Sequence, residues 1–330
     1  MELKKIGLLG GRGYVGQEIF KVLSQHDFLK ITSVFSTSKS GHQVDQAMDQ
    51  SLIYQDLATD KIKLSDEDAF ILALPNNQSQ PYIDLIHRHN PKAIIVDLSA
   101  DNRFDDDWEY RVPELSKPKQ SSRISNPGCY ASGFIALSHP LIENGLIAPD
   151  QTLITPAVSG YSGGGKNMIA SMKEGNLPPH FDYSLGLSHK HIPEMMMHSG
   201  LRVAPLFMPS VGMFEQGMLV RLAIPATDFS KNVTIHDVHE IYQEAYRDHP
   251  MIRVCGLDES LSLQCSRQLS ADGLAGQDGL EIFCFNNVET QQFLIIARLD
   301  NLGKGAAGAA VQNLNIMLGC SPNAGLNCDC

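Results

Sequence analysis

Short apolar runs alternate with segments of helical spacing over the first hundred residues. The apolar runs have the length of buried strands, and the segments between them repeat their apolar side chains with the period of a helix. The predicted strands are residues 4–10, 29–36, 69–75 and 92–100, and the predicted helices are 14–26 and 78–90. Strands that alternate with helices indicate βαβ units, and hence a mostly parallel sheet with right-handed crossovers.

The pattern changes after about residue 147. Strand-like runs now follow one another across long loops, with one clear helix at 234–250, which is typical of an α+β domain on a mostly antiparallel sheet. The runs are 152–160, 201–210, 217–226 and 291–300. A last helix is predicted at 303–319, and its many Ala and Gly residues indicate close packing against another backbone.

Composition narrows the class of protein. The chain has 330 residues, 43% of them hydrophobic and 19% charged, as in a soluble globular protein. A net charge of -11 argues against general affinity for nucleic acid or for an anionic membrane. No apolar run approaches the roughly 18 residues of a membrane span, and the first apolar stretch is too short for a signal peptide.

The cysteines indicate a reducing compartment. Seven are scattered along the chain without the spacing of a disulfide framework, so free thiols in the cytoplasm are expected. Cys328 and Cys330 lie close together in the terminal NCDC, with Cys320 nearby. A metal site there is possible, but a frayed terminus is the favoured interpretation, and no metal is predicted.

A glycine-rich turn follows the first predicted strand and precedes the first helix. Gly11, Gly13 and Gly16 fit the pattern G-x-G-x-x-G, with Gly10 before them. Such a turn lets a pyrophosphate approach the backbone while the N-terminus of the helix faces the anion. The βαβ context favours a dinucleotide site over a merely structural turn.

The end of the second strand bears on the choice of dinucleotide. An NAD site usually has an Asp or Glu there for the ribose hydroxyls, but this strand is followed by Ser36, Ser38 and Lys39. Hydroxyl groups and a cation suit a 2′-phosphate better, and Arg12 could lie on the other side of the adenosine. NADP is therefore predicted, with a solvated loop as the alternative.

Cys129 follows an Asn-Pro-Gly turn and precedes a segment of helical spacing at 130–145. Because Pro127 and Gly128 do not fit inside a helix, Cys129 is expected at or next to the helix N-terminus. There the helix dipole and unpaired N–H groups favour the thiolate, the form that attacks. The alternative is a small buried hydrophobe, as most free cysteines are. Beside a dinucleotide site, a reactive thiol implies acyl-thioester redox chemistry.

Two further stretches could carry chemistry. His189 and His191 are expected on one face of an extended segment, as a general base with a supporting partner or as a zinc pair for which no further ligand motif appears. Residues 159–166 could form either an anion-binding loop or a flexible one. The candidates in that stretch are Ser159, Ser162 and Lys166.

Together these motifs resemble the N-acetyl-γ-glutamyl-phosphate reductase family, within the aspartate-semialdehyde dehydrogenase-like group. The resemblance runs nearly end to end, and its most specific stretches are PGCY and HKHIPE in that order. It also covers GGRGYVGQEI, ALPNNQS, DLSADNRF, VPEL, VSGYSGGGK and DNLGKGAAGAAVQNLNIMLG. The segment 167–188 departs from the family, which leaves the exact acyl chain open.

The resemblance implies an α/β fold with a Rossmann doubly wound parallel sheet and a second α+β catalytic and oligomerisation domain. The implied dinucleotide domain spans 1–147 and is completed by the C-terminal segment 302–330, and the catalytic domain spans 148–301. A homodimer or homotetramer is expected. The residues implied to hold the dinucleotide are Gly10, Gly13, Tyr14, Val15 and Gly16, with Asn301, Lys304 and Gly305 near the nicotinamide.

The implied reaction is the NADPH-dependent conversion of N-acetyl-γ-glutamyl phosphate to the semialdehyde and phosphate, in arginine biosynthesis. Cys129 attacks the acyl phosphate and forms a thioester, which is then reduced. His189 takes the thiol proton and later protonates the oxygen, and His191 supports the site. Two alternatives remain open: the same chemistry on aspartyl or N-acetyl-aminoadipyl phosphate, and a dinucleotide-binding sensor without turnover.

Overall fold

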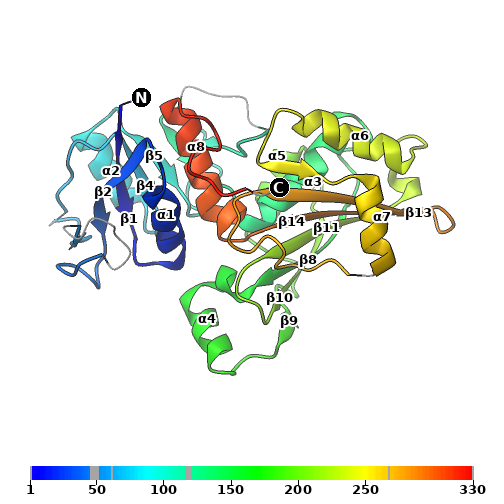
Figure 1. Ribbon diagram of the computed structural model, residues 1–330, viewed down its shortest axis with the longest axis horizontal. Helices are drawn as coiled ribbons and strands as arrows, with labels where there is room; N and C mark the ends of the chain where they lie inside the picture. Colours follow the sequence, from blue (N-terminus) through cyan, green and yellow to red (C-terminus); the bar gives the residue numbers. More distant parts are fainter. Residues whose placement is uncertain (1, 45–51, 61, 116–120, 267, 329–330) are drawn as a thin grey trace. The chain divides into compact units, whose positions relative to one another are not determined.

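The computed structural model describes residues 2–44, 52–60, 62–115, 121–266 and 268–328. The chain forms two compact units, and each is described by itself (Figure 1). The first unit contains residues 1–127 and 306–327, and the second contains 128–305 with the last three residues of the chain.

A seven-stranded sheet forms the centre of the first unit, with the strand order β3-β2-β1-β4-β5-β7-β6. All of its neighbouring strands pair in parallel, as the βαβ pattern predicts. Its strands are β1 (Lys4–Leu9), β2 (Leu29–Phe35), β3 (Tyr54–Gln55), β4 (Ala69–Leu72), β5 (Ile94–Asp97), β6 (Glu109–Tyr110) and β7 (Arg123–Ser125). Its helices are α1 (Tyr14–Ser24), α2 (Gln80–His89) and α8 (Gly308–Leu318).

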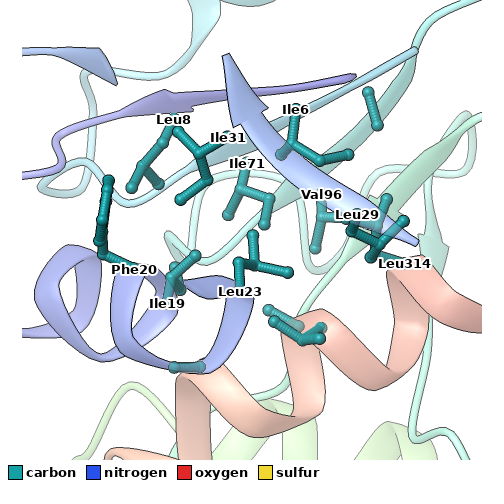
Figure 2. Close-up of a cluster of buried hydrophobic side chains, with 14 of the residues drawn as sticks. Ile6, Leu8, Ile19, Phe20, Leu23, Leu29, Ile31, Ile71, Val96 and Leu314 are labelled. Carbon is teal, nitrogen blue, oxygen red and sulfur yellow. The ribbon is translucent and has the colours of Figure 1, made fainter. Parts of the chain in front are cut away.

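Helices cover both faces of this sheet, so its central strands are apolar on both sides. Leu8 of β1 packs in a cluster with α1 and α8, which Figure 2 shows around Ile19, Leu23 and Leu314. The next residue, Leu9, points to the opposite face and packs in a second cluster with α2. This arrangement confirms the parallel sheet predicted from the apolar runs and the doubly wound fold implied by the resemblance.

The Ala- and Gly-rich helix α8 belongs to the first unit, although it follows the second unit in the chain. Gly308, Ala309 and Ala310 are buried at its start, which agrees with the predicted close packing. Polar bonds also fix it, because Gln312 donates to Glu114 and Asn313 donates to the carbonyl oxygen of Arg111.

A second seven-stranded sheet forms the centre of the second unit, in the order β12-β13-β14-β11-β8-β10-β9. Four of its neighbouring pairs are antiparallel, while β8–β10 and β12–β13 are parallel, so the sheet is mostly antiparallel as expected. Its strands are β8 (Ile154–Gly160), β9 (His180–Asp182), β10 (Leu206–Gly212), β11 (Met218–Pro225), β12 (Ile252–Val254), β13 (Leu280–Asn287) and β14 (Gln292–Leu299). Its helices are α3 (Cys129–Glu143), α4 (Gly165–Lys173), α5 (Ile192–Ser199), α6 (Ile235–Tyr246) and α7 (Leu257–Ser266).

Helix α3 packs directly on one face of this second sheet. A Cβ at Gly133 would lie 2.8 Å from the side chain of Val220 on β11, so the close approach requires glycine there. Helix α6 holds α3 from outside, because the hydroxyl group of Tyr242 donates to the carbonyl oxygen of Leu137. The opposite face is covered in part by α7, through Leu263.

The division between the units differs from the predicted one. The sequence pattern places the boundary after residue 147, whereas the units divide between Pro127 and Gly128 and again between Gly305 and Ala306. The reason is that α3 is apolar nearly all round and packs on the second sheet, which its own sequence does not reveal. The pattern also predicts one clear helix in the second domain, and it misses the short helices α4, α5 and α7.

Candidate active site

Cys129 is the first residue of α3, as the turn before it predicts. Gly128 is the N-cap residue and has an extended backbone, and its carbonyl oxygen accepts from the N–H of Ser132 at 2.8 Å. The Cys129 thiol is therefore at the positive end of the helix dipole and is half-buried, in a position where a thiolate is favoured.

Gly305 lies against the backbone of this cysteine. A Cβ at Gly305 would come within 2.8 Å of Cys129 Cβ and 3.3 Å of its Cα, so no larger residue fits without displacing the thiol. The turn that carries Gly305 is organised by Asp300, whose side chain accepts from the N–H groups of Leu302 and Gly303. It continues as a π-helical turn, Gly303–Ala307, which leads into α8.

A buried carboxylate also reaches the start of α3. Glu194 is fully buried in the first turn of α5, and its Oε2 accepts from the N–H of Gly128 at 3.0 Å. This bond ties the turn that carries the histidines to the turn that carries Cys129.

The two histidines lie side by side in the turn before α5, with ring centroids 4.7 Å apart and the rings nearly perpendicular. His191 is the N-cap residue of α5 and is 5% exposed. The sequence predicts an extended segment here, but the histidines lie in a turn, because Pro193 at the start of α5 begins a helix.

An aromatic enclosure surrounds His189. Its ring centroid lies 6.1 Å from that of Tyr130, 5.7 Å from that of Tyr183 and 5.2 Å from that of Phe207. Burial among these rings, with a smaller effect of the Lys190 charge, lowers the pKa of His189 to about 4. The imidazole is therefore neutral at pH 7.

Most other thiols of the described chain are buried. Burial raises the pKa values of Cys255 and Cys284 to about 12, so both remain protonated at neutral pH. Cys320 is also buried, whereas Cys328 in the tail is half-buried with its Sγ 3.6 Å from the carbonyl oxygen of Pro250. Cys330, the last residue of the NCDC tail, lies outside the described residues.

The stretch 159–166 is an ordered turn rather than a flexible loop. It runs from the end of β8 through the 3-10 turn Tyr161–Gly164 into α4. The N–H groups of Gly160, Tyr161 and Ser162 donate to carbonyl oxygens of the segment 214–217, so these three amides are already used. The part left open to an anion is the exposed end of the loop at 163–166, which includes Lys166.

Four polar residues predicted for the site lie around this turn, inside the second unit. The hydroxyl group of Ser159 donates to the carbonyl oxygen of Gly160 at 3.0 Å. The Asn301 side chain accepts from the N–H of Gly217 and donates to Ser162 Oγ at 2.8 Å. Asn301 thus joins the turn of Gly305 to the loop at 159–166, and Lys304 beside it is 3% exposed.

The glycine turn of the first unit fits a dinucleotide pyrophosphate. Gly10 has φ +83°, and a Cβ there would lie 2.3 Å from the carbonyl oxygen of Ala73. A Cβ at Gly16 would lie 2.5 Å from the carbonyl oxygen of Gly10, which lets the first turn of α1 pack on the loop. Helix α1 begins at Tyr14 with Gly13 as its N-cap residue, so its free N–H groups face the end of the turn.

The residues expected near a 2′-phosphate come together in part. Arg12 of the glycine turn donates to Ser38 Oγ at 2.6 Å, and Lys39 is the next residue along the chain. Ser36 is 4% exposed, and its N–H donates to Gln55, so it has little access to a ligand. Arg12, Ser38 and Lys39 therefore form the basic, hydroxyl-bearing group at this edge of the sheet.

Three residues with the marks of a functional role are not among the site residues predicted from the sequence. Two are Tyr183, whose ring lies beside that of His189, and Glu194, which accepts from the N–H of Gly128. The third is Arg103, a guanidinium that is 6% exposed and donates to the carbonyl oxygens of Leu98 and Asn126. The only indication of Arg103 in the sequence is that it lies in DLSADNRF, one of the stretches shared with the family, and the resemblance assigns it no role.

A metal-binding cluster and a membrane-spanning helix are both absent from the described residues. No group of three or more His, Cys, Asp or Glu side chains is placed to hold a metal ion among them. No helix in the described parts of the chain is long and apolar enough to cross a membrane.

Comparison with known proteins decides the family. Residues 5–122 match the family described as "Semialdehyde dehydrogenase, NAD binding domain", and residues 129–301 match "Semialdehyde dehydrogenase, dimerisation domain". N-acetyl-gamma-glutamyl-phosphate reductases of Brucella ovis and Brucella melitensis biotype 1 are each 37% identical over 325 residues, which cover 96% of this chain and 99% of theirs. The chain belongs to the N-acetyl-gamma-glutamyl-phosphate reductase family. It is therefore an enzyme, and the resemblance seen in its motifs is confirmed.

Solved structures of aspartate semialdehyde dehydrogenases have the same fold as this reductase. Aspartate semialdehyde dehydrogenase II of Vibrio cholerae, complexed with ASA, is 14% identical with a TM-score of 0.74 over 96% of this chain and 99% of that one. The Candida albicans aspartate semialdehyde dehydrogenase with NADP is 17% identical with a TM-score of 0.68, over 98% and 100%. At such identities the likeness establishes the two-domain fold of the reductase and no more.

Proposed function

We propose that this reductase converts N-acetyl-γ-glutamyl phosphate to N-acetylglutamate semialdehyde and phosphate, with NADPH as the reductant, in arginine biosynthesis. The observation that carries the proposal is the half-buried Cys129 at the start of α3, packed against Gly305 and tied through Glu194 to a turn with two histidines. A sensor that only binds dinucleotide would need the glycine turn but not this arrangement.

In the proposed mechanism Cys129 is the nucleophile. Its thiolate attacks the acyl carbon, phosphate leaves, and a thioester forms on the sulfur. The dinucleotide, when bound, supplies the hydride that reduces this thioester. His189 and His191 are proposed to share the acid–base work at the thiol and at the carbonyl oxygen, with His189 as the principal residue and His191 as its support.

Other residues are proposed to contact the substrate and the cofactor. Ser159, Ser162 and Lys166 are proposed to line the acyl site. Asn301 acts there by holding Ser162, and Lys304 and Gly305 are proposed to border the nicotinamide.

The reductase is proposed to prefer NADPH to NADH, with Lys39 as one cause. A charge-assisted hydrogen bond contributes about 1.5–3 kcal/mol, so Lys39→Ala is expected to weaken NADPH roughly 10- to 100-fold and to leave NADH nearly unchanged. The measurement is the ratio of kcat/KM for the two cofactors in the wild type and the variant.

Lys30→Ala, a change in the exposed lysine of β2, is the matched control for the loss of one charge. An unchanged cofactor ratio in Lys39→Ala would remove Lys39 from the site. A wild-type ratio in favour of NADH would contradict the cofactor assignment itself.

The substrate assignment is tested in the reverse direction. Phosphate-dependent reduction of NADP⁺ is measured with N-acetylglutamate semialdehyde, aspartate semialdehyde and N-acetyl-aminoadipate semialdehyde. The first is expected to give the highest kcat/KM. A preference for either of the others would change the acyl chain, and no turnover with all three would favour the sensor.

A homodimer or homotetramer is proposed for the reductase. The face of the second sheet that α7 covers only in part holds an apolar groove of about 640 Å³, lined by residues that include Ile154, Ala223, Phe285 and Leu294. Met208 of β10 lies on the strand next to β8, which carries Ile154 of this groove, and its side chain is 40% exposed. Light scattering is expected to give a dimer or a larger assembly, and a monomer at assay concentration would contradict the proposal.

We also infer a cytoplasmic location. The five cysteines whose side chains the structure describes are free thiols, as expected in a reducing compartment. Fractionation of the source cells tests this, because activity outside the cytoplasm would overturn it.

A further inference from the structure

One nitrogen of the His189 ring is already committed within its own turn. The backbone N–H of His191 donates to His189 Nδ1 at 3.1 Å, so Nδ1 carries a lone pair and no proton. A neutral imidazole has one N–H, and it must then be on Nε2. Since His189 is neutral at pH 7, with a pKa of about 4, the Nε2–H tautomer is the form present.

The second nitrogen faces Tyr183. Its Nε2 lies 3.4 Å from the Tyr183 hydroxyl oxygen, which can accept the Nε2–H. The Tyr183 hydroxyl group is hydrogen-bonded in turn to that of Tyr130, which donates to the carbonyl oxygen of Ser210 at 2.9 Å. These bonds link the His189 ring through the two tyrosines to the backbone of β10.

Tyr183 itself is firmly placed. It directly follows β9, and its N–H donates to the carbonyl oxygen of Pro209 at 3.1 Å. The backbone of Tyr183 is therefore fixed at the edge of the second sheet. A separation of 3.4 Å is at the long end for a hydrogen bond, so a substrate oxygen that approaches closer can replace Tyr183 at little cost.

We propose that His189 acts as a neutral hydrogen-bond donor to the carbonyl oxygen of the acyl substrate, and that Tyr183 is the positioning residue that holds its Nε2–H until the substrate binds. The inference rests on the proposed function and gives the two histidines different tasks, one at the carbonyl oxygen and one at the thiol. His189 stabilises the oxyanion that develops when Cys129 attacks, without gaining or losing a proton. A proton on Nδ1 would displace the N–H of His191, so the thiol proton is left to the second imidazole of the pair.

The tautomer is tested directly by NMR. Histidine labelled with ¹⁵N is introduced into the full-length enzyme, and the His189 signals are assigned by their loss in His189→Gln. Protonated Nε2 and unprotonated Nδ1 are expected at pH 7, with no conversion to the cation down to about pH 5, one unit above the pKa. An Nδ1–H tautomer or a cation at pH 7 would overturn the inference.

The role of Tyr183 is tested with Tyr183→Phe, which keeps the ring and removes the hydroxyl group. Loss of one weak hydrogen bond is expected to lower kcat about five-fold, with KM for NADPH unchanged. The pH profile of Cys129 alkylation by iodoacetamide should also stay unchanged, because His189 does not take the thiol proton. A shifted profile, or an unchanged kcat, would contradict the role.

Tyr82→Phe is the matched control, because Tyr82 is a half-buried tyrosine on α2 of the first unit and none of the proposed site residues. The NMR and alkylation measurements need no substrate. If the enzyme reduces a different acyl phosphate, the substrate assignment fails while these two results stand, so the two failures are distinguishable.

Discussion

Replacement of Cys129 by serine is expected to abolish turnover, with kcat reduced by at least about four powers of ten. A serine hydroxyl is not ionised at neutral pH, so the helix start that favours a thiolate has no anion to stabilise. Loss of a nucleophile in an enzyme that works through a covalent intermediate has effects of this order. Binding of NADPH, measured by its fluorescence, should stay within about two-fold, since the glycine turn belongs to the first unit.

Cys328→Ser is the control for Cys129→Ser. Cys328 is the other half-buried thiol among the described cysteines, and it lies in the tail. We expect wild-type turnover from this variant. Near-normal turnover in Cys129→Ser would remove the thioester from the mechanism, whereas a loss in both variants would indicate a general sensitivity of the fold.

The second large effect is expected at His189. His189→Ala should lower kcat by about two to three powers of ten, the usual loss when one donor to an oxyanion is removed. His189→Gln keeps an N–H donor on a side chain of similar reach, so it should retain at least about ten-fold more activity than the alanine variant. The measurement is kcat for both variants at saturating substrate and NADPH.

Two outcomes of the His189 series would contradict this account. Equal losses in the Ala and Gln variants would mean that a donor is not what His189 provides. A shift of the Cys129 alkylation profile in His189→Gln would make His189 the group that takes the thiol proton. The same profile measured in His191→Asn shows whether that proton goes to the second histidine.

Local chemistry made parts of this site predictable. Pro127 and Gly128 cannot continue inside a helix, so the start of α3 at Cys129 follows from the turn alone. The glycines of the first turn predict a strand, a tight turn and a helix, because only a residue without Cβ fits at Gly10 and Gly16. Both predictions depend on a few neighbouring residues.

The contacts that complete the site depend on residues far apart in the chain. Glu194 reaches Gly128 across 66 positions, and nothing in the stretch HKHIPE indicates its partner. The sequence of the turn after β8 suggests N–H groups that could bind an anion, but in the structure those at its start donate to carbonyl oxygens of the segment 214–217. Helix α3 likewise belongs to the second unit because of the sheet on which it packs. Contacts of this kind depend on the tertiary structure, and the periodicity of apolar residues along the chain does not predict them.

The central claim is that the reaction passes through a thioester on Cys129, and a phosphate-free burst tests it most directly. Enzyme, NADP⁺ and N-acetylglutamate semialdehyde are mixed without phosphate, and NADPH formation and the mass of the Cys129 peptide are followed. The account predicts a burst of about one NADPH per chain, an N-acetylglutamyl group on Cys129, and its release when phosphate is added. Steady turnover on phosphate addition, with no preceding burst and no adduct on Cys129, would contradict it.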